Sequence, residues 1–143
     1  MMDTILCSVD INRPDEQHRL LEVANEMAMA HDAQLDVITV MPDFGSTVVG
    51  AYFKDHAVTS ARDTAGVKLK SLVVDVLGVE RSASVRRIIS VGNVYEEVLK
   101  TARINEADLI VIGAHRPDLK DFLLGPNAAR VVRHANCSVY VVR

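Results

Sequence analysis

Near its C-terminus the chain reads DLIVIGAHRPDLKDFLLGPNAARVVRHANCSVYVV (residues 108–142). The continuously apolar run Asp108–Ile112 predicts a strand buried on both faces, as in a parallel sheet. A loop follows over Gly113–Leu124, and apolar residues then recur at helical spacing through Asn127–Ala135. The final apolar run, Ser138–Val142, predicts another strand. A unit of strand, loop, helix and strand is typical of α/β proteins.

The same alternation extends back to the start of the chain. Apolar runs predict three earlier strands, and helical periodicity predicts three earlier helices. The strands are Thr4–Val9, Leu35–Val40 and Ser84–Val91, the helices are Glu16–His31, Phe53–Leu77 and Val94–Ala102, and Met41–Tyr52 is expected to be a loop. Gly78 is expected to end the second helix. We therefore predict a doubly wound, five-stranded parallel sheet with helices on both faces, a Rossmann-like α/β fold, in one domain over residues 1–143.

Composition excludes several classes of function. The 143 residues carry a net charge of −3 without any long run of Lys or Arg, so neither nucleic acid nor a membrane is expected as a partner. No stretch approaches the roughly 18 apolar residues of a membrane helix. The two cysteines, Cys7 and Cys137, are expected to be buried, reduced thiols of a cytoplasmic protein, with a disulfide or redox pair as the alternative.

The loop between Gly113 and Gly125 is the strongest candidate for a ligand site. Ligands of open α/β sheets bind beyond the carboxyl ends of the strands, where the strand order reverses. This loop follows a buried strand, contains His115, Arg116 and Lys120, and ends at the N-terminus of a helix, whose free N–H groups suit a phosphate. Gly125 is expected to allow a positive φ before that helix. The alternative is that both glycines serve ordinary turns.

Three neighbouring residues also have two interpretations each. Asp10 closes the first strand, and it either faces the same crevice or caps the turn that follows. Asn127 either caps the last helix or contacts phosphate. Pro126 fits the first helical turn, but it removes one N–H that a phosphate could use.

Two segments resemble a known family, the universal stress proteins of the small single-domain bacterial type. TILCSVD (residues 4–10) is similar to the family's first strand, and ADLIVIGAHRP together with LLGPNAARVVRHANCSVYVVR (residues 107–117 and 123–143) is similar to its most characteristic stretch. Members that bind ATP have Gly, two residues, Gly, nine residues, then Gly-Ser or Gly-Thr. Here Arg116 replaces the second glycine, eight residues precede Gly125, and Pro126 replaces the hydroxyl residue. The short spacing resembles the F-type subgroup most closely.

The resemblance implies a nucleotide-binding domain with the strand order 3-2-1-4-5 and a crevice between the first and fourth strands. The implied ligand is an adenine nucleotide: ATP, or ADP or AMP, with Mg²⁺ accompanying ATP. Val9 and Asp10 would border adenine and ribose, Val40 would face the adenine edge, Gly113 would lie against the ribose and first phosphate, and His115, Arg116, Gly125, Pro126 and Asn127 would surround the phosphates. It also implies a homodimer formed through Val139–Val142, a strand edge suited to pairing.

Other chemistries have no matching pattern. The Walker motif, the dinucleotide motif G-x-G-x-x-G, the hydrolase elbow G-x-S-x-G and a metal-binding His or Cys spacing are all absent from the sequence. We therefore expect a cytoplasmic stress-response protein that binds ATP as a dimeric regulatory module, with no catalytic residues and at most weak ATP hydrolysis. The alternative is a dimeric interaction module whose nucleotide site is degenerate and empty.

Overall fold

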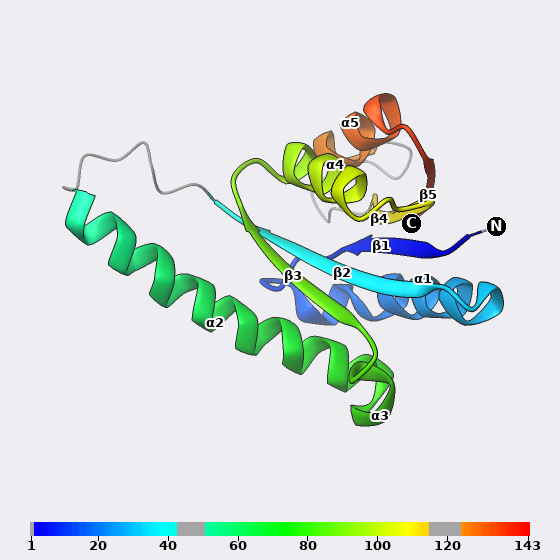
Figure 1. Cartoon of the computed structure of the whole chain (residues 1–143), viewed down its shortest axis with the longest axis horizontal. Helices are drawn as coiled ribbons and strands as arrows, with labels where there is room; N and C mark the ends of the chain where they lie inside the picture. The colour runs from blue at the N-terminus through cyan, green and yellow to red at the C-terminus, as the bar shows by residue number, and fades with distance from the viewer. Residues whose placement is uncertain (1, 43–50, 115–123) are drawn as a thin grey trace.

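The computed structural model describes residues 2–42, 51–114 and 124–143, with residues 51–58 described by their backbone alone. Figure 1 shows a central sheet with helices on both of its faces. In chain order the elements are β1 (Thr4–Ser8), the 3-10 turn η1 (Pro14–Glu16), α1 (His18–His31), β2 (Gln34–Met41), α2 (Ala51–Leu77), α3 (Val79–Ser82), β3 (Arg86–Val91), α4 (Val94–Ile104), β4 (Leu109–Gly113), α5 (Pro126–His134) and β5 (Ser138–Val142).

The five strands form one parallel sheet in the order β3-β2-β1-β4-β5. This confirms the predicted α/β fold and the strand order implied by the resemblance. The chain proceeds from β1 outward to β3 and then crosses to β4 on the other side of β1. The helices that follow β1 and β4 therefore leave the sheet toward opposite faces, which opens a crevice at the carboxyl ends of these two strands.

Apolar side chains of the sheet point alternately into two cores. In β4, Leu109 and Val111 pack on the side of α1 and α2, whereas Ile110 and Ile112 pack on the side of α4 and α5. All four are at most 5% exposed. Burial of each such side chain stabilises the fold by roughly 1.5–3 kcal/mol. The prediction that this strand is buried on both faces is confirmed.

The second helix differs from the sequence-based expectation. It begins at Ala51, inside the predicted loop Met41–Tyr52, and Met41 belongs to β2; residues 43–50 lie outside the described part of the chain. The helix continues without interruption through Gly66. Gly78 ends it with φ +87°, a left-handed conformation that favours glycine. The short helix α3 that follows was not predicted.

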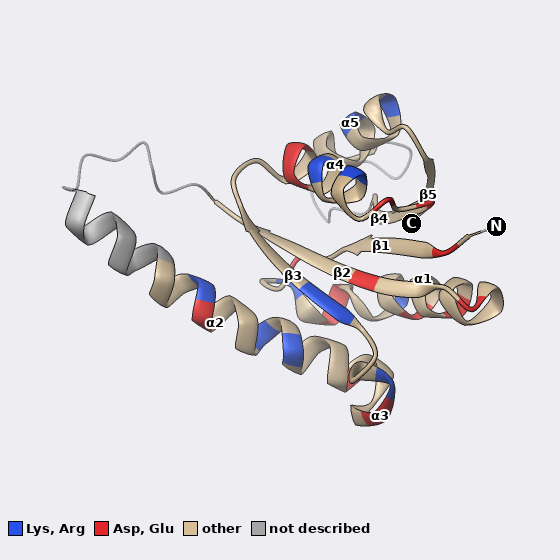
Figure 2. Ribbon diagram, in the orientation of Figure 1, with Lys and Arg blue, Asp and Glu red and all other residues tan. Residues whose placement is uncertain are grey.

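An ion pair between a buried carboxylate and a half-exposed guanidinium joins β2 and β3 at the amino-terminal end of the sheet, where Figure 2 shows an acidic band on β2 beside a basic band on β3. The Asp36 side chain is fully buried, and Arg86 donates to its two oxygens from Nε and Nη2, both at 2.8 Å. Asn105, just after α4, also donates to Asp36, at 2.9 Å. The hydrogen bond to Asp36 raises the pKa of Arg86. These contacts tie the edge strand and α4 to the centre of the sheet.

The two cysteines are free thiols on opposite faces of the sheet. Cys7 lies in the core beside α1 and α2, whereas Cys137 packs against the core beside α4 and α5. The alternative of a disulfide between them is therefore wrong. Burial raises the pKa of both thiols. Within the described residues, no helix combines the length and the apolar character needed to cross a bilayer.

Candidate functional site

A cavity of about 1230 Å³ opens at the carboxyl-terminal edge of the sheet. Its walls are the ends of β1, β2 and β4, the turn after β3, the first turn of α5, and one side each of α1 and α2. This is the edge where the strand order reverses, as the fold predicts. The predicted site residues that line it are Val9, Asp10, Val40, Gly113, Gly125, Pro126 and Asn127. His115 and Arg116 lie outside the described residues.

The wall after β1 is a compact turn. The N–H of Val9 donates to the carbonyl of Ile38, which fixes the end of β1 against β2. The side chain of Asp10 accepts a hydrogen bond from the N–H of Asn12 at Oδ1, 2.9 Å away, and its carbonyl accepts one from Arg13. Asp10 therefore caps its own turn and lines the cavity, so both of its interpretations hold structurally.

The opposite wall is formed by β4 and the start of α5. Gly113 has no positive φ, and a β-carbon placed on it would approach Leu20 at an ordinary 3.7 Å. The protein's own packing therefore does not require a glycine there. Gly125 has φ −63° and ψ 158°, an extended conformation open to any residue, so the predicted positive φ is wrong. Extended backbone suffices because Pro126 starts the helix with its own fixed φ.

The N-terminus of α5 presents free hydrogen-bond donors to the cavity. The first intrahelical bond is from the N–H of Ala129 to the carbonyl of Gly125. The N–H groups of Asn127 and Ala128 find no acceptor among the residues that the structure describes, and the helix has no side-chain cap. Unpaired N–H groups and the helix dipole give this end partial positive charge, which favours an anion.

Cationic side chains outnumber acidic ones among the described residues that line the cavity, although the chain as a whole is acidic. Among the described lining residues, Arg13, Arg19, Lys68 and Arg143 are cationic, and Asp10 and Glu16 are acidic. Arg13 and Glu16 form an exposed ion pair at 3.5 Å. The chain as a whole carries −3. The excess of cationic side chains among the described lining residues favours anionic ligands, because nearby charges act on a bound ligand more strongly than distant ones.

Several lining residues were not found from the sequence. Lys68 lies on α2 and Arg19 on α1, and both were assigned to helices without any role. Thr39 on β2 is 2% exposed, and Gln17 before α1 is 8% exposed, yet both border the cavity. No local pattern marks these positions, since each faces the cavity only because of how its element packs. The sequence offered one indication for Gln17 and Arg19: both lie at the start of the predicted helix that follows the first strand, which is close to the expected ligand edge of the sheet.

Comparison with known proteins supports the same conclusion about the fold. A family model described as the Universal stress protein family matches residues 1–143. The chain belongs to the universal stress protein family. Universal stress protein G of Escherichia coli O157:H7 is 27% identical over 149 aligned positions, covering 100% of both chains. A hypothetical protein solved as a test case of structural genomics superposes with a TM-score of 0.80 at 24% identity, covering 99% of this chain and 96% of the other.

Two solved universal stress proteins contain nucleotides. One from Archaeoglobus fulgidus is in complex with dAMP, with a TM-score of 0.64 and 22% identity, and each chain covers 100% of the other. Another is in complex with cAMP, with a TM-score of 0.63 and 18% identity over 99% of this chain and 97% of the other. At these identities the likeness to this chain is one of fold. Members of the universal stress protein family with this architecture thus bind adenine nucleotides.

Proposed function

We propose that this universal stress protein binds an adenine nucleotide, ATP foremost, in the cavity at the carboxyl edge of its sheet. The observation that carries the proposal is the pairing of a cation-rich cavity with the open N-terminus of α5. We also propose that the chain acts in the cytoplasm as a single nucleotide-binding domain of the F-type subgroup. Binding would serve regulation in the stress response, through a change of partner or conformation, with little turnover.

The proposed ligand spans the cavity from β2 to α5. Val9, Asp10 and Val40 would hold the adenine and ribose, Gly113 would pass close to the ribose and first phosphate, and the start of α5 would hold the outer phosphates. ATP supplies the negative charge that this wall favours. Among the described residues, no three His, Cys, Asp or Glu side chains gather where they could hold a metal, so Mg²⁺ would be bound mainly through the phosphates.

Gly113→Ala provides a direct test because the protein itself leaves room for the added methyl group. We expect ATP affinity, measured by calorimetry, to fall at least about tenfold, or roughly 1.4 kcal/mol. Gly66→Ala, a glycine in the middle of α2 whose new methyl group would meet Ile89 at 3.5 Å, is the matched control and should leave affinity unchanged. Wild-type protein that fails to bind ATP at millimolar concentration would contradict the proposal.

Gly125→Val tests the phosphate end of the same site. The extended backbone at Gly125 accepts valine without strain. Any loss of ligand affinity in this variant should therefore come from the valine side chain, which would occupy space beside the phosphates. We expect ATP to lose more affinity than adenosine, which has no phosphates. Equal losses for the two ligands would place the phosphates elsewhere.

One observation favours the second candidate, an interaction module with an empty site. Pro126 occupies the first turn of α5 and removes one N–H from the phosphate wall. The ultraviolet spectrum of freshly purified protein distinguishes the two functions. Bound nucleotide raises absorbance at 260 nm relative to 280 nm and would exclude the empty module.

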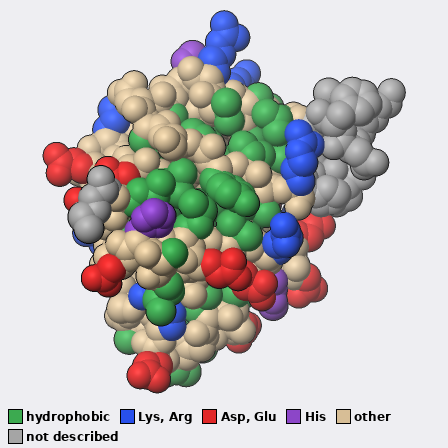
Figure 3. All heavy atoms as spheres, turned by 90° about the vertical axis from the view of Figure 1, so that its right-hand side faces the viewer, with side chains coloured by type: hydrophobic (Ala, Val, Ile, Leu, Met, Phe, Trp, Pro, Cys, Tyr) green, Lys and Arg blue, Asp and Glu red, His purple; other side chains and the backbone are tan. Residues whose placement is uncertain are grey.

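We further propose that two copies pair through β5, an edge strand of the sheet. Val139 and Val141 are half-buried, and Tyr140 on the same strand is 44% exposed. Figure 3, which turns the right-hand side of Figure 1 toward the viewer, shows hydrophobic side chains between charged ones on that face of the molecule. An edge strand with apolar side chains is a template for pairing with a second chain.

A further inference from the structure

Gln17 lies at the junction of η1 and α1 and is one of six buried polar residues in the part of the chain that the structure describes. Only 8% of it is exposed, although it borders the cavity. Its N–H donates to the carbonyl of Pro14, and its carbonyl accepts from the N–H of Leu21 at 3.0 Å. The backbone of Gln17 is therefore fixed to both helical segments, and its side chain starts from a rigid position.

The side chain of Gln17 holds both ends of the turn that follows β1. Its Oε1 accepts a hydrogen bond from the N–H of Asp10 at 3.1 Å, and its Nε2 donates to the carbonyl of Arg13 at 3.2 Å. The turn itself contributes only the bonds from Asn12 to the Asp10 side chain and from Arg13 to the Asp10 carbonyl. A primary amide suits this place because it alone offers one acceptor and two donors on a neutral group.

The two bonds determine where the carboxylate of Asp10 lies. Because Oδ1 of Asp10 already accepts a hydrogen bond from Asn12, Oδ2 is the carboxylate oxygen that can accept one from a ligand. Without the Gln17 side chain, the Asp10 N–H would lose its partner and would have to bond to water or move, whereas the Arg13 carbonyl would keep the bond from the N–H of Glu16. The wall would then shift relative to β4 and α5 across the cavity.

We infer that Gln17 is a positioning residue of the ligand site, which holds the Asp10–Arg13 wall in its binding conformation without touching the ligand. The inference rests on the proposed nucleotide site for the identity of the ligand. It concerns the nucleoside end of that site, because Asp10 is the residue of this wall that is proposed to border adenine and ribose. Phosphate binding at the far side of the cavity should respond to Gln17 only indirectly.

The test compares Gln17→Met, which keeps the length and removes both hydrogen bonds, with His18→Met, an exposed neighbour on the same helix turn. Adenosine is the main probe, because it carries no charge, and ATP is the second. We expect Gln17→Met to weaken both ligands by the same factor, about tenfold, and His18→Met to leave both unchanged. Gln17→Glu keeps an acceptor for the Asp10 N–H and should lose less adenosine affinity than Gln17→Met.

A double-mutant cycle separates positioning from a general loss of stability. In an Asp10→Ala background, Gln17→Met should weaken adenosine by less than twofold, because the group it positions is gone, while the losses in unfolding free energy still accumulate. Full tenfold loss in that background, or unchanged affinity in the single variant, would overturn the inference.

Hydrogen exchange distinguishes failure of this inference from failure of the proposed function. In Gln17→Met the amide of Asp10 should exchange at least tenfold faster than in the wild type, with or without nucleotide. If wild-type protein binds no adenine ligand but this amide is released, the nucleotide proposal fails and the positioning of the wall stands. Unchanged exchange at Asp10 would overturn the inference whatever the ligand.

Discussion

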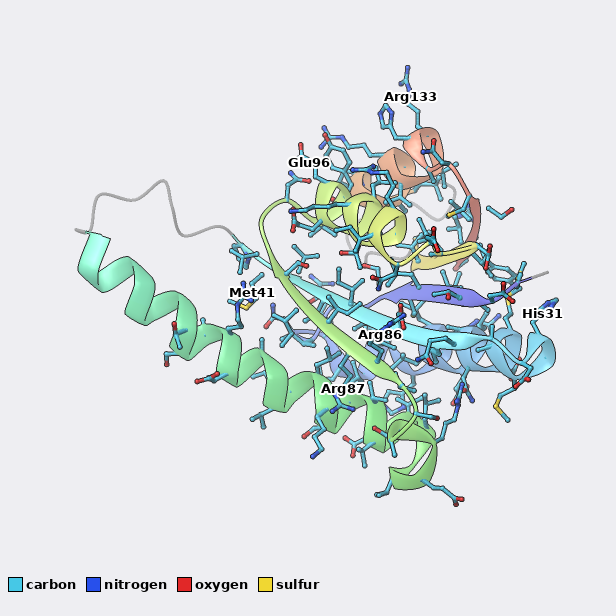
Figure 4. All side chains as sticks on the ribbon, in the orientation of Figure 1. His31, Met41, Arg86, Arg87, Glu96 and Arg133 are labelled. Atoms are coloured by element: carbon cyan, nitrogen blue, oxygen red, sulfur yellow. The ribbon has the colours of Figure 1, made fainter. Side chains whose placement is uncertain are left out.

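Replacement of Arg86 by methionine should test how much the ion pair between Arg86 and Asp36 contributes to stability. The change removes two hydrogen bonds of 2.8 Å from the fully buried Asp36 and leaves it with Asn105 alone. Figure 4 labels Arg86 on β3, together with its neighbour Arg87. Hydrogen bonds to a charged group contribute about 1.5–3 kcal/mol each, and removing one partner of a buried pair costs about 3–5 kcal/mol.

The exposure of Arg86 determines how large the loss of unfolding free energy should be within the range of about 3–5 kcal/mol. Its side chain is 53% exposed, so water can enter the vacated space and hydrate part of the Asp36 carboxylate. We therefore expect the free energy of unfolding to fall by about 3 kcal/mol, toward the lower end. For a chain of this length the midpoint of thermal unfolding should fall by roughly 6–12 °C.

Urea unfolding is the assay, with the m-value as a check that the denatured state is unchanged. Arg87→Met is the matched control, because the Arg87 side chain is exposed and has no hydrogen bond or ion pair with any described residue, and its effect should stay within about 0.5 kcal/mol. The double variant Asp36→Leu/Arg86→Met should recover much of the loss, since no unpaired charge remains. If Arg86→Met proved no less stable than Arg87→Met, the ion pair would contribute nothing measurable to stability, contrary to this prediction.

Three further predictions concern other parts of the molecule. Gly66→Ala should raise the free energy of unfolding by about 1 kcal/mol, because alanine favours the helix interior and its methyl group meets only ordinary contacts; a loss of stability in urea would contradict this. The N–H groups of Asp3 and Thr4 donate hydrogen bonds to the Asp108 carboxylate and lower its pKa. The ionised carboxylate therefore stabilises the folded protein above the ordinary pKa of an aspartate, and this contribution is lost as the pH falls through the lowered pKa of Asp108. The stability advantage of the wild type over Asp108→Asn should therefore shrink below about pH 4 in unfolding curves, and an advantage independent of pH would speak against it. Val141→Asp should halve the mass found by light scattering if β5 forms the dimer, and an unaltered mass would indicate another interface.

Much of the fold could be predicted because it depends on local periodicity. The apolar run at β4 implied burial on both faces, and the alternation of strands with helices implied a parallel sheet whose ligand edge lies at the carboxyl ends. Gly78 was recognised as a helix end, since a left-handed residue after a helix favours glycine. The positive φ predicted at Gly125 was wrong, because a glycine before a helix is compatible with either sign of φ. The neighbouring Pro126 makes an extended backbone sufficient there.

Local sequence patterns were enough to predict the order and type of the elements, the edge at which a ligand would bind and the residues Asp10, Gly113 and Gly125 that border it. The other side chains that complete the site and the core became known from the three-dimensional arrangement of the elements. Arg86 and Asp36 are 50 positions apart, and Asn105 is 69 positions from Asp36. Gln17 bonds to Asp10 and Arg13, seven and four positions away, but no periodicity marks these bonds, because they depend on how the turn after β1 folds against the start of α1. Periodicity records which face of an element is apolar, but the partners of a polar group depend on how distant elements meet, which no local pattern contains.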